Sequence, residues 1–262
     1  METVSDVLAT AVERLVAAGV PEPRADAEVL LAHVLGTTRT GLVVAARRPL
    51  PGGAAATLLT LLTRREGREP VQHLVGEREF WSLALAVDRR VLVPRPETEV
   101  LVETALAVAP RARRIVDVGT GSGAVAAALA CERPAATVWA SDIDAEALCV
   151  ARVNLARHAP RVRLVQGDLL CPFRVAVFDL VVSNPPYCAD GAFADLAPEV
   201  RDHEPRGALA GGRDGLDVLR ALVATAAPVL ASGGWLVVEM GAGQAEAVRV
   251  LIERDGRKWR RL

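Results

Sequence analysis

The segment Asn184-Pro185-Pro186-Tyr187 contains residue types that suit chemistry on a planar amino group. It follows the apolar run 178–182 and Ser183, which predict a buried strand that ends at a rigid polar corner. Two successive prolines fix φ at about −65° and remove two backbone donors, so the corner presents bare carbonyl oxygens. The Asn184 side-chain oxygen and the Pro185 carbonyl can each accept one N–H, and the flat group can stack on Tyr187. Taken alone, the four letters also fit a Pro-rich turn or a polyproline-type ligand segment.

The loop Gly119-Thr120-Gly121-Ser122-Gly123 follows another short apolar run. Its glycines permit a tight turn and a close approach of a ligand to the backbone. The spacing departs from the dehydrogenase pattern GxGxxG, because the third glycine comes one position early. Asp117, just before the loop, would repel a pyrophosphate and favours a sulfonium cofactor that carries an amino group. We therefore predict that Asp117 and the five loop residues bind S-adenosylmethionine in preference to NAD.

Two more predicted strands end in carboxylates. Asp142 lies 23 residues after Gly119 (142 − 119), a spacing typical of a carboxylate that accepts from two ribose hydroxyls. Asp168 and Leu169 follow the next strand and are placed to meet the edge of an adenine ring. Together with Asn184, these strand ends are predicted to line one crevice with contacts of nucleoside shape.

The elements that must position these residues are short apolar strands that alternate with helices after Pro110. This alternation predicts an α/β fold with a doubly wound, mostly parallel sheet. In such a sheet, ligands bind beyond the carboxyl ends of the strands, where the strand order reverses. The predicted strands span 114–118, 137–141, 163–166, 179–183 and 235–239, and the predicted helices span 123–132, 145–157, 216–227 and 244–253.

Residues 1–76 are predicted to form a small helical bundle. Apolar residues recur at helical spacing in segments that begin near Ser5-Asp6, Pro23 and Ala54. Bundles of this kind usually bind a partner or hold a larger domain, and we assign this one to substrate recognition.

Residues 77–98 are predicted to form a β-hairpin linker between the bundle and a cofactor-binding domain at 99–262. Alternating apolar residues over 80–87, followed by the run 91–93, indicate the two strands. The linker ends at the stiff polar segment 94–99, where Pro96 or Thr98 begins a helix.

The bulk composition excludes several classes of protein. The chain has 262 residues, 51% of them hydrophobic, and a formal net charge of −1, which argues against a general nucleic-acid binder. We expect the arginine clusters at 111–114 and 254–261 to be solvated faces. The four cysteines show no CxxC spacing and predict free thiols, with no metal site. With no signal-type segment and no run of membrane-spanning length, the chain is predicted to be cytoplasmic.

These motifs resemble the glutamine N5-methyltransferases of class I peptide release factors, and the resemblance covers nearly the whole chain. The NPPY letters are shared with DNA-adenine and some RNA methyltransferases. The segment Pro94-Arg95-Pro96-Glu97-Thr98-Glu99 and the helical N-terminal domain narrow the resemblance to the glutamine enzymes. Further matching segments are Pro23-Arg24-Ala25-Asp26-Ala27-Glu28, Glu69-Pro70-Val71-Gln72, Glu204-Pro205, Ala208-Leu209 and Gly212-Arg213-Asp214-Gly215-Leu216.

The resemblance implies that residues 119–123, Asp142, the Asp168–Leu169 turn and Asn184 hold S-adenosylmethionine. It also implies that the corner at 184–187 holds the substrate glutamine of a Gly-Gly-Gln loop. The catalytic residues would be Asn184, Pro185 and Tyr187, with Pro186 completing the substrate site.

An amide nitrogen is a poor nucleophile, because its lone pair is delocalised into the carbonyl group. Accepting both amide hydrogens can localise that lone pair and aim it at the methyl group, and no general base is needed early. We therefore expect His203 to be structural. The resemblance further implies a monomer that acts on release factors, with no direct contact to nucleic acid or membrane.

Other interpretations stay open at the level of sequence. The same reaction could act on a ribosomal-protein glutamine, and a nucleic-acid amino-methyltransferase would lack a basic recognition domain. A non-catalytic cofactor-binding protein is a different class, suggested only by the C-terminus. There the family continues into a further strand pair, whereas this chain has the basic segment 253–262. We expect one exposed sheet edge and marginal stability or a tendency to aggregate.

Overall fold

A computed structural model describes residues 2–254, and contacts within the chain divide it into two compact units. The helical unit comprises Met1–Glu77 together with Ala197–His203, and the sheet unit comprises Arg78–Leu196 and Glu204–Leu262. The segment Ala197–His203 therefore belongs to the helical unit although its neighbours in sequence do not. The predicted division of the chain into residues 1–76, 77–98 and 99–262 does not place this segment with the helical bundle.

The helical unit packs its leucines into one core, which includes Leu15, Leu30, Leu31 and Leu58. Its first helix begins at Val4, just before the Ser5-Asp6 signal. Thr3 caps the helix and exchanges hydrogen bonds with Asp6 in a capping box. Three further helices are too short for a periodic pattern and were not predicted. The helices of this unit are α1 (Val4–Ala17), α2 (Pro23–Val34), α3 (Arg39–Ala45), α4 (Ala54–Glu66), α5 (Val71–Val75) and α9 (Pro198–His203).

Ion pairs attach α9 to the rest of the helical unit. Arg65 is buried and donates to Asp26 Oδ2 at 2.7 Å and to Glu199 Oε1 at 2.8 Å. Arg68 also donates to both carboxylate oxygens of Glu199, each at 2.8 Å. Burial works to raise the pKa of Glu199, but the hydrogen bonds from Arg68 and Arg65 outweigh it and hold the pKa at about 2. Glu199 is therefore ionised throughout the neutral range and holds α9 in place.

The hairpin turns earlier in the chain than the sequence predicts. Its strands are β1 (Glu77–Phe80) and β2 (Leu83–Ala86), and residues 91–93 are not a strand. Trp81 and Ser82 make the turn with φ values of 52° and 58°. The prediction was wrong because this turn normally requires Gly or Asn, and neither is present. A hydrogen bond of 2.8 Å from the Trp81 backbone N–H to Glu99 Oε1 supports the turn.

The sheet unit contains, within residues 2–254, a five-stranded parallel sheet in the order β5-β4-β3-β6-β7. The predicted fold class is confirmed, and the strands fall within one residue of the predicted positions, except that β7 begins five residues earlier than position 235 (235 − 230). The bounds are β3 (Arg114–Val118), β4 (Thr137–Asp142), β5 (Arg163–Gln166), β6 (Phe178–Ser183) and β7 (Leu230–Val238).

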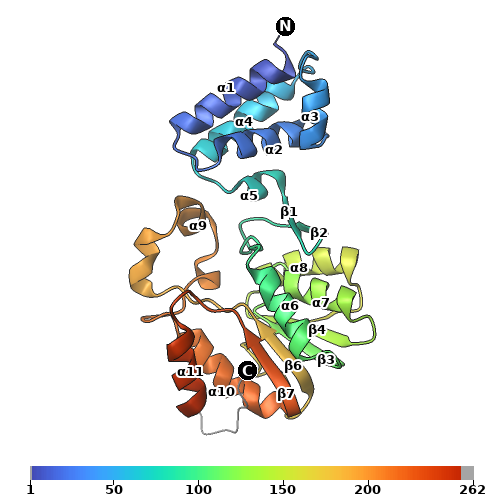
Figure 1. Cartoon of the computed structure of the whole chain (residues 1–262), viewed down its shortest axis with the longest axis vertical. Helices are drawn as coiled ribbons and strands as arrows, with labels where there is room; N and C mark the ends of the chain where they lie inside the picture. Colours follow the sequence, from blue (N-terminus) through green and yellow to red (C-terminus); the bar gives the residue numbers. More distant parts are fainter. Residues whose placement is uncertain (1, 255–262) are drawn as a thin grey trace. The chain divides into compact units, whose positions relative to one another are not determined.

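Helices cover both faces of this sheet, as Figure 1 shows. Successive strand residues point to opposite faces, so Ile115 and Leu180 pack with α7 whereas Val116 and Val181 pack with α10. Both strand faces are thus buried, which explains why the strands are continuously apolar. The helices are α6 (Thr98–Val108), α7 (Ala124–Glu132), α8 (Ala145–His158), α10 (Asp217–Val229) and α11 (Ala245–Arg254), with short 3-10 turns at Asp190–Asp195 and Arg206–Ala208.

The edge of the sheet at β7 is relevant to the exposed edge that we expect from the C-terminal sequence. Within residues 2–254, β7 pairs only with β6, so no strand lies along its other edge. The end of the basic segment, 255–262, lies outside the described residues, and the marginal stability expected from it stays a prediction. Over the same described range, every helix is too short or too polar to cross a membrane.

Candidate cofactor and substrate site

The sheet topology brings the predicted site residues to one edge. Residue pairing aligns Val118 of β3 with Ser141 of β4 and with Ser183 of β6, so these three strands end at the same level. Asp142 pairs with Gln166 in the same way, which brings in the end of β5. The strand order reverses between β3 and β6. The glycine loop, both acidic turns and the Asn184 corner therefore follow four adjacent strands at the switch point, where α/β sheets bind ligands.

The glycine loop has room for a ligand at its first two glycines. Gly119 and Gly121 have φ values of 69° and 54°, and a Cβ added at either would meet nothing within 4 Å. Gly123 differs, because an added Cβ would lie 3.3 Å from side-chain carbons of Ala151 and Leu155. The third glycine thus allows α7 to pack on α8, while the first two leave open space for a cofactor.

Asn154 on α8 supports the glycine loop and was not predicted as a site residue. Its side chain is 1% exposed and donates to the Ser122 carbonyl at 2.8 Å. The same amide exchanges two hydrogen bonds with the backbone of Ala86 at the end of β2, at 2.7 and 2.9 Å. An asparagine among the apolar residues of a predicted helix was the available signal, because a buried side-chain amide needs hydrogen-bond partners.

Asp117 lies completely buried beneath the loop. Its Oδ2 accepts a hydrogen bond from Thr120 Oγ1 at 2.6 Å and another from the Ala126 N–H at 3.1 Å. Burial raises the pKa of Asp117 to about 7, with a smaller contribution from the charge of Asp142, against these hydrogen bonds. The side chains of Thr120 and Ser122 are buried as well. Direct loop contacts with a ligand would therefore come from the backbone, while Asp117 would act through its charge.

Asp142 links the end of β4 to the glycine loop. Its Oδ2 accepts from the Gly121 N–H at 2.9 Å and its Oδ1 accepts from the Asp144 N–H at 3.0 Å. Each carboxylate oxygen has a second lone pair, so both can still accept from a ribose hydroxyl. Burial raises the pKa of Asp142 against these backbone hydrogen bonds. The next residue, Ile143, was not predicted as a site residue, yet its apolar side chain is 66% exposed at this edge.

The Asp168–Leu169 turn lies beside Asp142. The Gly167 N–H donates to the Asp142 carbonyl at 2.9 Å and connects this turn to β4. Asp168 is exposed, whereas Leu169 is half-buried, has a φ of 46° and packs against the core under α10. The turn therefore offers an exposed carboxylate and a backbone edge to the site.

The Asn184 side chain is oriented by a residue far away in sequence. Its Nδ2 donates to Thr98 Oγ1 at 3.1 Å. The Oδ1 atom is on the opposite side of the same planar amide, and within the described part of the chain no donor reaches it. Pro185 follows as a buried residue in a trans peptide. The corner thus keeps an open side-chain acceptor next to a backbone carbonyl that has no neighbouring amide donor, because Pro186 follows.

Tyr187 is held at both its ends. Its hydroxyl donates to Glu239 Oε1 at 3.4 Å, and burial, followed by the charge of Glu239, raises the pKa of Tyr187. Its carbonyl accepts from Gln244 Nε2 at 3.1 Å. A Cβ added to Gly215 would lie 2.4 Å from the same carbonyl, so only glycine fits there. The aromatic ring therefore has a fixed position next to Asn184.

The segment 94–99 contacts this corner and is itself held by hydrogen bonds. Arg95 donates to both carboxylate oxygens of Glu204, at 2.6 and 2.8 Å, and the Glu204 side chain is 1% exposed. Burial raises the pKa of Glu204 against the charge of Arg95. Thr98 contacts Asn184, and Glu99 accepts from Trp81. His203 belongs to the helical unit, where its Nε2 lies 3.0 Å from the Gly67 carbonyl, which agrees with a structural role.

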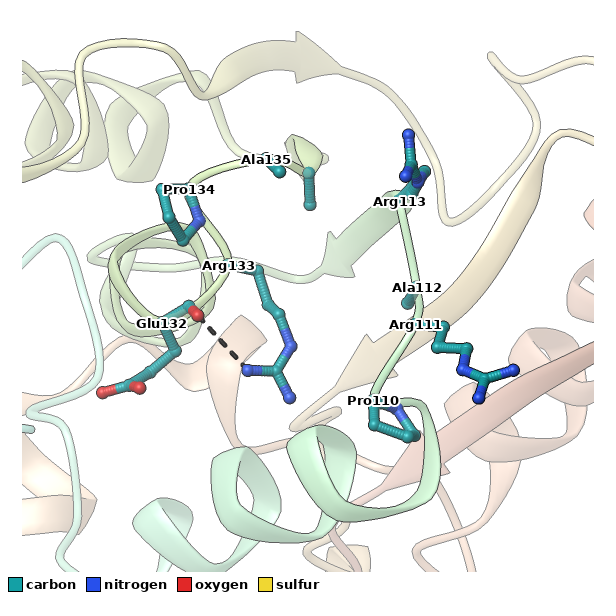
Figure 2. Close-up of a pocket in the computed structure, with 9 residues that line it drawn as sticks. Pro110, Arg111, Ala112, Arg113, Glu132, Arg133, Pro134 and Ala135 are labelled. Carbon is teal, nitrogen blue, oxygen red and sulfur yellow. Dashed lines mark hydrogen bonds between the residues drawn. The ribbon is translucent and has the colours of Figure 1, made fainter.

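A separate hollow of about 360 Å³ lies at the opposite end of the sheet (Figure 2). It is lined by residues 110–113, before β3, and 132–136, before β4. Arg133 donates to the carbonyls of Glu132 and Leu106, at 3.2 and 3.1 Å. None of the predicted site residues lines this hollow.

A parallel sheet with a glycine loop after its first strand, a carboxylate after its second and an NPPY corner after its fourth defines a Rossmann-like methyltransferase. The family model of the Methyltransferase small domain matches residues 96–200, and that of the PrmC N-terminal domain matches residues 6–76. The solved catalytic domain of hMettl16, in complex with a MAT2A 3'UTR hairpin, shares this fold with a TM-score of 0.57. It is 15% identical, and the match covers 81% of this chain and 76% of that one.

Curated relatives narrow the class to one family. A release factor glutamine methyltransferase of Geobacter sulfurreducens is 45% identical over 91% of this chain and 84% of its own length. One of Cereibacter sphaeroides is 46% identical over 96% of this chain and 90% of its own length. The chain belongs to the release factor glutamine methyltransferase family.

Proposed function

We propose that this enzyme transfers a methyl group from S-adenosylmethionine to the side-chain amide nitrogen of the glutamine in the Gly-Gly-Gln motif of class I peptide chain release factors. It would thereby support translation termination. The observation that carries the proposal is the pair of acceptors formed by Asn184 Oδ1 and the Pro185 carbonyl, at the same sheet edge as the glycine loop.

S-adenosylmethionine supplies an electrophilic methyl group on a positively charged sulfur. The open backbone at Gly119 and Gly121 would hold its amino-acid part, supported beneath by the Asp117 charge. Asp142 would accept from the ribose hydroxyls with the free lone pairs of its two oxygens. The Asp168–Leu169 turn would meet the adenine edge, and the exposed Ile143 offers an apolar surface beside it.

The substrate amide would be bound by its two hydrogens. Asn184 Oδ1 and the Pro185 carbonyl accept one N–H each, while Tyr187 packs against the flat amide group. This geometry directs the nitrogen lone pair at the methyl group, and positioning of this kind contributes about 7–11 kcal/mol to lowering a barrier. As the nitrogen–carbon bond forms, the carbon–sulfur bond would break and an uncharged thioether would leave. The surplus amide proton would then pass to water, so the corner requires no histidine base.

The helical unit is proposed to recognise the protein substrate. In support, α9 belongs to this unit, although it comes from the loop between Tyr187 and α10. A chain that begins at Glu77 is expected to bind the cofactor and to lose methylation of an intact factor. Because that truncation also removes Arg65 and Arg68, the full-length Glu199→Gln variant is the control for loss of the α9 ion pairs alone. Full activity of the shortened chain would reduce the unit to a packing element. The enzyme is further proposed to be a cytoplasmic monomer that does not bind nucleic acid directly.

A labelling experiment distinguishes the proposed substrate from the alternatives. The purified enzyme is incubated with methyl-labelled S-adenosylmethionine and, separately, with class I release factors, ribosomal proteins and DNA. We expect label in the release factors, and none in a factor whose Gly-Gly-Gln glutamine is changed to alanine. Label in a ribosomal protein or DNA in place of the factors would support one of the alternatives, and no label in any of them would indicate a non-catalytic protein.

A further inference from the structure

Thr98, the first residue of α6, contacts the amide of Asn184 from the side opposite to its free oxygen. The hydrogen bond from Asn184 Nδ2 to Thr98 Oγ1 is 3.1 Å long and joins residues 86 positions apart. Thr98 is 4% exposed, so water does not compete for this contact. The partner of Asn184 is therefore a buried acceptor in a fixed position.

This contact fixes one end of the amide and leaves the other end facing the open side. The oxygen and nitrogen of an asparagine side chain are nearly equal in size, and rotation by half a turn exchanges them. In the orientation seen here, Nδ2 donates to Thr98 and Oδ1 faces the open side. After half a turn the Thr98 hydroxyl would donate to Oδ1 instead, because a hydroxyl can both donate and accept. The opposite orientation would place an NH2 group against the NH2 group of a substrate amide, where neither can accept. The Thr98 hydroxyl thus holds the amide in place, and a substrate NH2 group is matched only by the orientation that presents Oδ1.

Thr98 is itself held firmly by the surrounding segment. Its backbone N–H donates to the Arg95 carbonyl at 3.1 Å, at the start of α6. On one side, Arg95 is anchored by the buried Glu204, and on the other Glu99 accepts from the Trp81 backbone. The segment that carries the Thr98 hydroxyl is therefore held on both sides. A group that positions another group must itself have a fixed position.

We propose that Thr98 is a positioning residue, whose hydroxyl keeps Asn184 in the orientation that accepts a hydrogen from the substrate amide. This inference rests on the proposed function of Asn184. Thr98 does not need to touch the substrate or the reacting atoms. Its effect on catalysis passes through Asn184 alone.

The test is single-turnover methyl transfer at saturating cofactor with Thr98→Val, which keeps the shape and removes the acceptor, and Thr98→Ser, which keeps the hydroxyl. We expect Thr98→Val to slow transfer about 3- to 10-fold, the effect of losing one hydrogen bond. Thr98→Ser is expected to remain within about 2-fold of the wild type. Cofactor affinity, measured by calorimetry, is expected to be the same in all three proteins.

A double-mutant cycle distinguishes positioning from a general loss of structure. If Thr98 acts only through Asn184, the double variant Thr98→Val/Asn184→Ala will be as slow as Asn184→Ala alone. Independent effects would multiply instead, and that result would overturn the inference. Should Thr98→Val fail to fold, Thr98→Ala replaces it in the same cycle and in the comparison with Thr98→Ser.

The test of Thr98 can fail without contradicting the proposed function. Unchanged transfer by Thr98→Val, with the wild type still methylating a release factor, overturns the role of Thr98 and leaves the proposed function standing. Equal losses in Thr98→Val and Thr98→Ser also overturn it, because the hydroxyl would then not be the cause. A wild type that methylates no release factor under these conditions contradicts the proposed function and, with it, this inference.

Discussion

The two ends of the same sheet differ in what they offer a ligand. At the carboxyl ends of the strands, Asp142, Asn184 and the glycine loop present open acceptors and uncovered backbone. At the amino ends, the hollow of Figure 2 is lined by arginines and short loops, with Arg133 bonded to backbone carbonyls. The residues that line the hollow include neither the glycine loop nor the acceptors of Asp142 and Asn184. In this fold, ligands bind beyond the carboxyl ends of the strands, and the predicted site residues lie at that end.

The largest effect is expected at the carboxyl edge, from Asn184→Ala. This variant removes the side-chain acceptor and leaves the two prolines in place, so single-turnover methyl transfer should slow about 10²- to 10³-fold. Asn184→Asp is the matched variant. It keeps an acceptor but adds a negative charge that stabilises the cationic ground state, so turnover should also fall while cofactor binding persists. An alanine variant within a few-fold of the wild type would make Asn184 merely a turn residue.

The second prediction concerns cofactor binding at the same edge. Asp142→Ala should weaken the affinity for S-adenosylmethionine about 10- to 100-fold, since hydrogen bonds to a charged group contribute about 1.5–3 kcal/mol each. The variant also removes the acceptor for the Gly121 N–H, which Asp142→Asn retains in part. Calorimetry reports both affinities. Unchanged binding in the alanine variant would show that Asp142 does not face the ribose.

A smaller effect is expected from pH. The pKa of Asp117 is raised to about 7, so its carboxyl is neutral below that pH and negative above it. A negative Asp117 attracts a cationic cofactor, and affinity should therefore rise several-fold between about pH 6 and pH 8. Asp117→Asn cannot titrate and should remove that part of the change. Identical pH profiles for the two proteins would contradict the role of the Asp117 charge.

The smallest effect is expected at the amino end of the sheet. Arg111→Ala combined with Arg113→Ala changes two residues that line the hollow of Figure 2. Neither residue lies near a strand end that carries the site, so cofactor affinity and methyl transfer should stay within about 2-fold of the wild type. Calorimetry and single-turnover methyl transfer measure these two quantities. A tenfold loss in either would contradict the difference between the two ends of the sheet.

Much of the site could be predicted from sequence because its residues directly follow apolar strands. Asp142, Asp168 and Asn184 each come within two residues of a strand end, and parallel pairing then brings them together. The position of each residue along the chain, close to the end of a strand, was sufficient for this prediction. The amphipathic and apolar patterns also located β3 and β5 to the residue.

Features that depend on distant contacts could not be predicted in this way. The Asn184–Thr98 hydrogen bond joins residues 86 positions apart, and Asn154 supports a loop 32 positions before it. The inclusion of α9 in the helical unit depends on Arg65 and Arg68, more than a hundred residues upstream. Sequence patterns report local periodicity, whereas these contacts exist only once both parts have folded.

Mass-spectrometric mapping of the methylated site is the sharpest test of whether the corner at Asn184 directs methylation to a glutamine amide nitrogen. A class I release factor is treated with cofactor and either wild-type enzyme or Asn184→Ala. We expect one added methyl group on the side-chain amide of the Gly-Gly-Gln glutamine with the wild type, and almost none in the same time with the variant. Methylation of a different side chain, or equal methylation by both proteins, would contradict it.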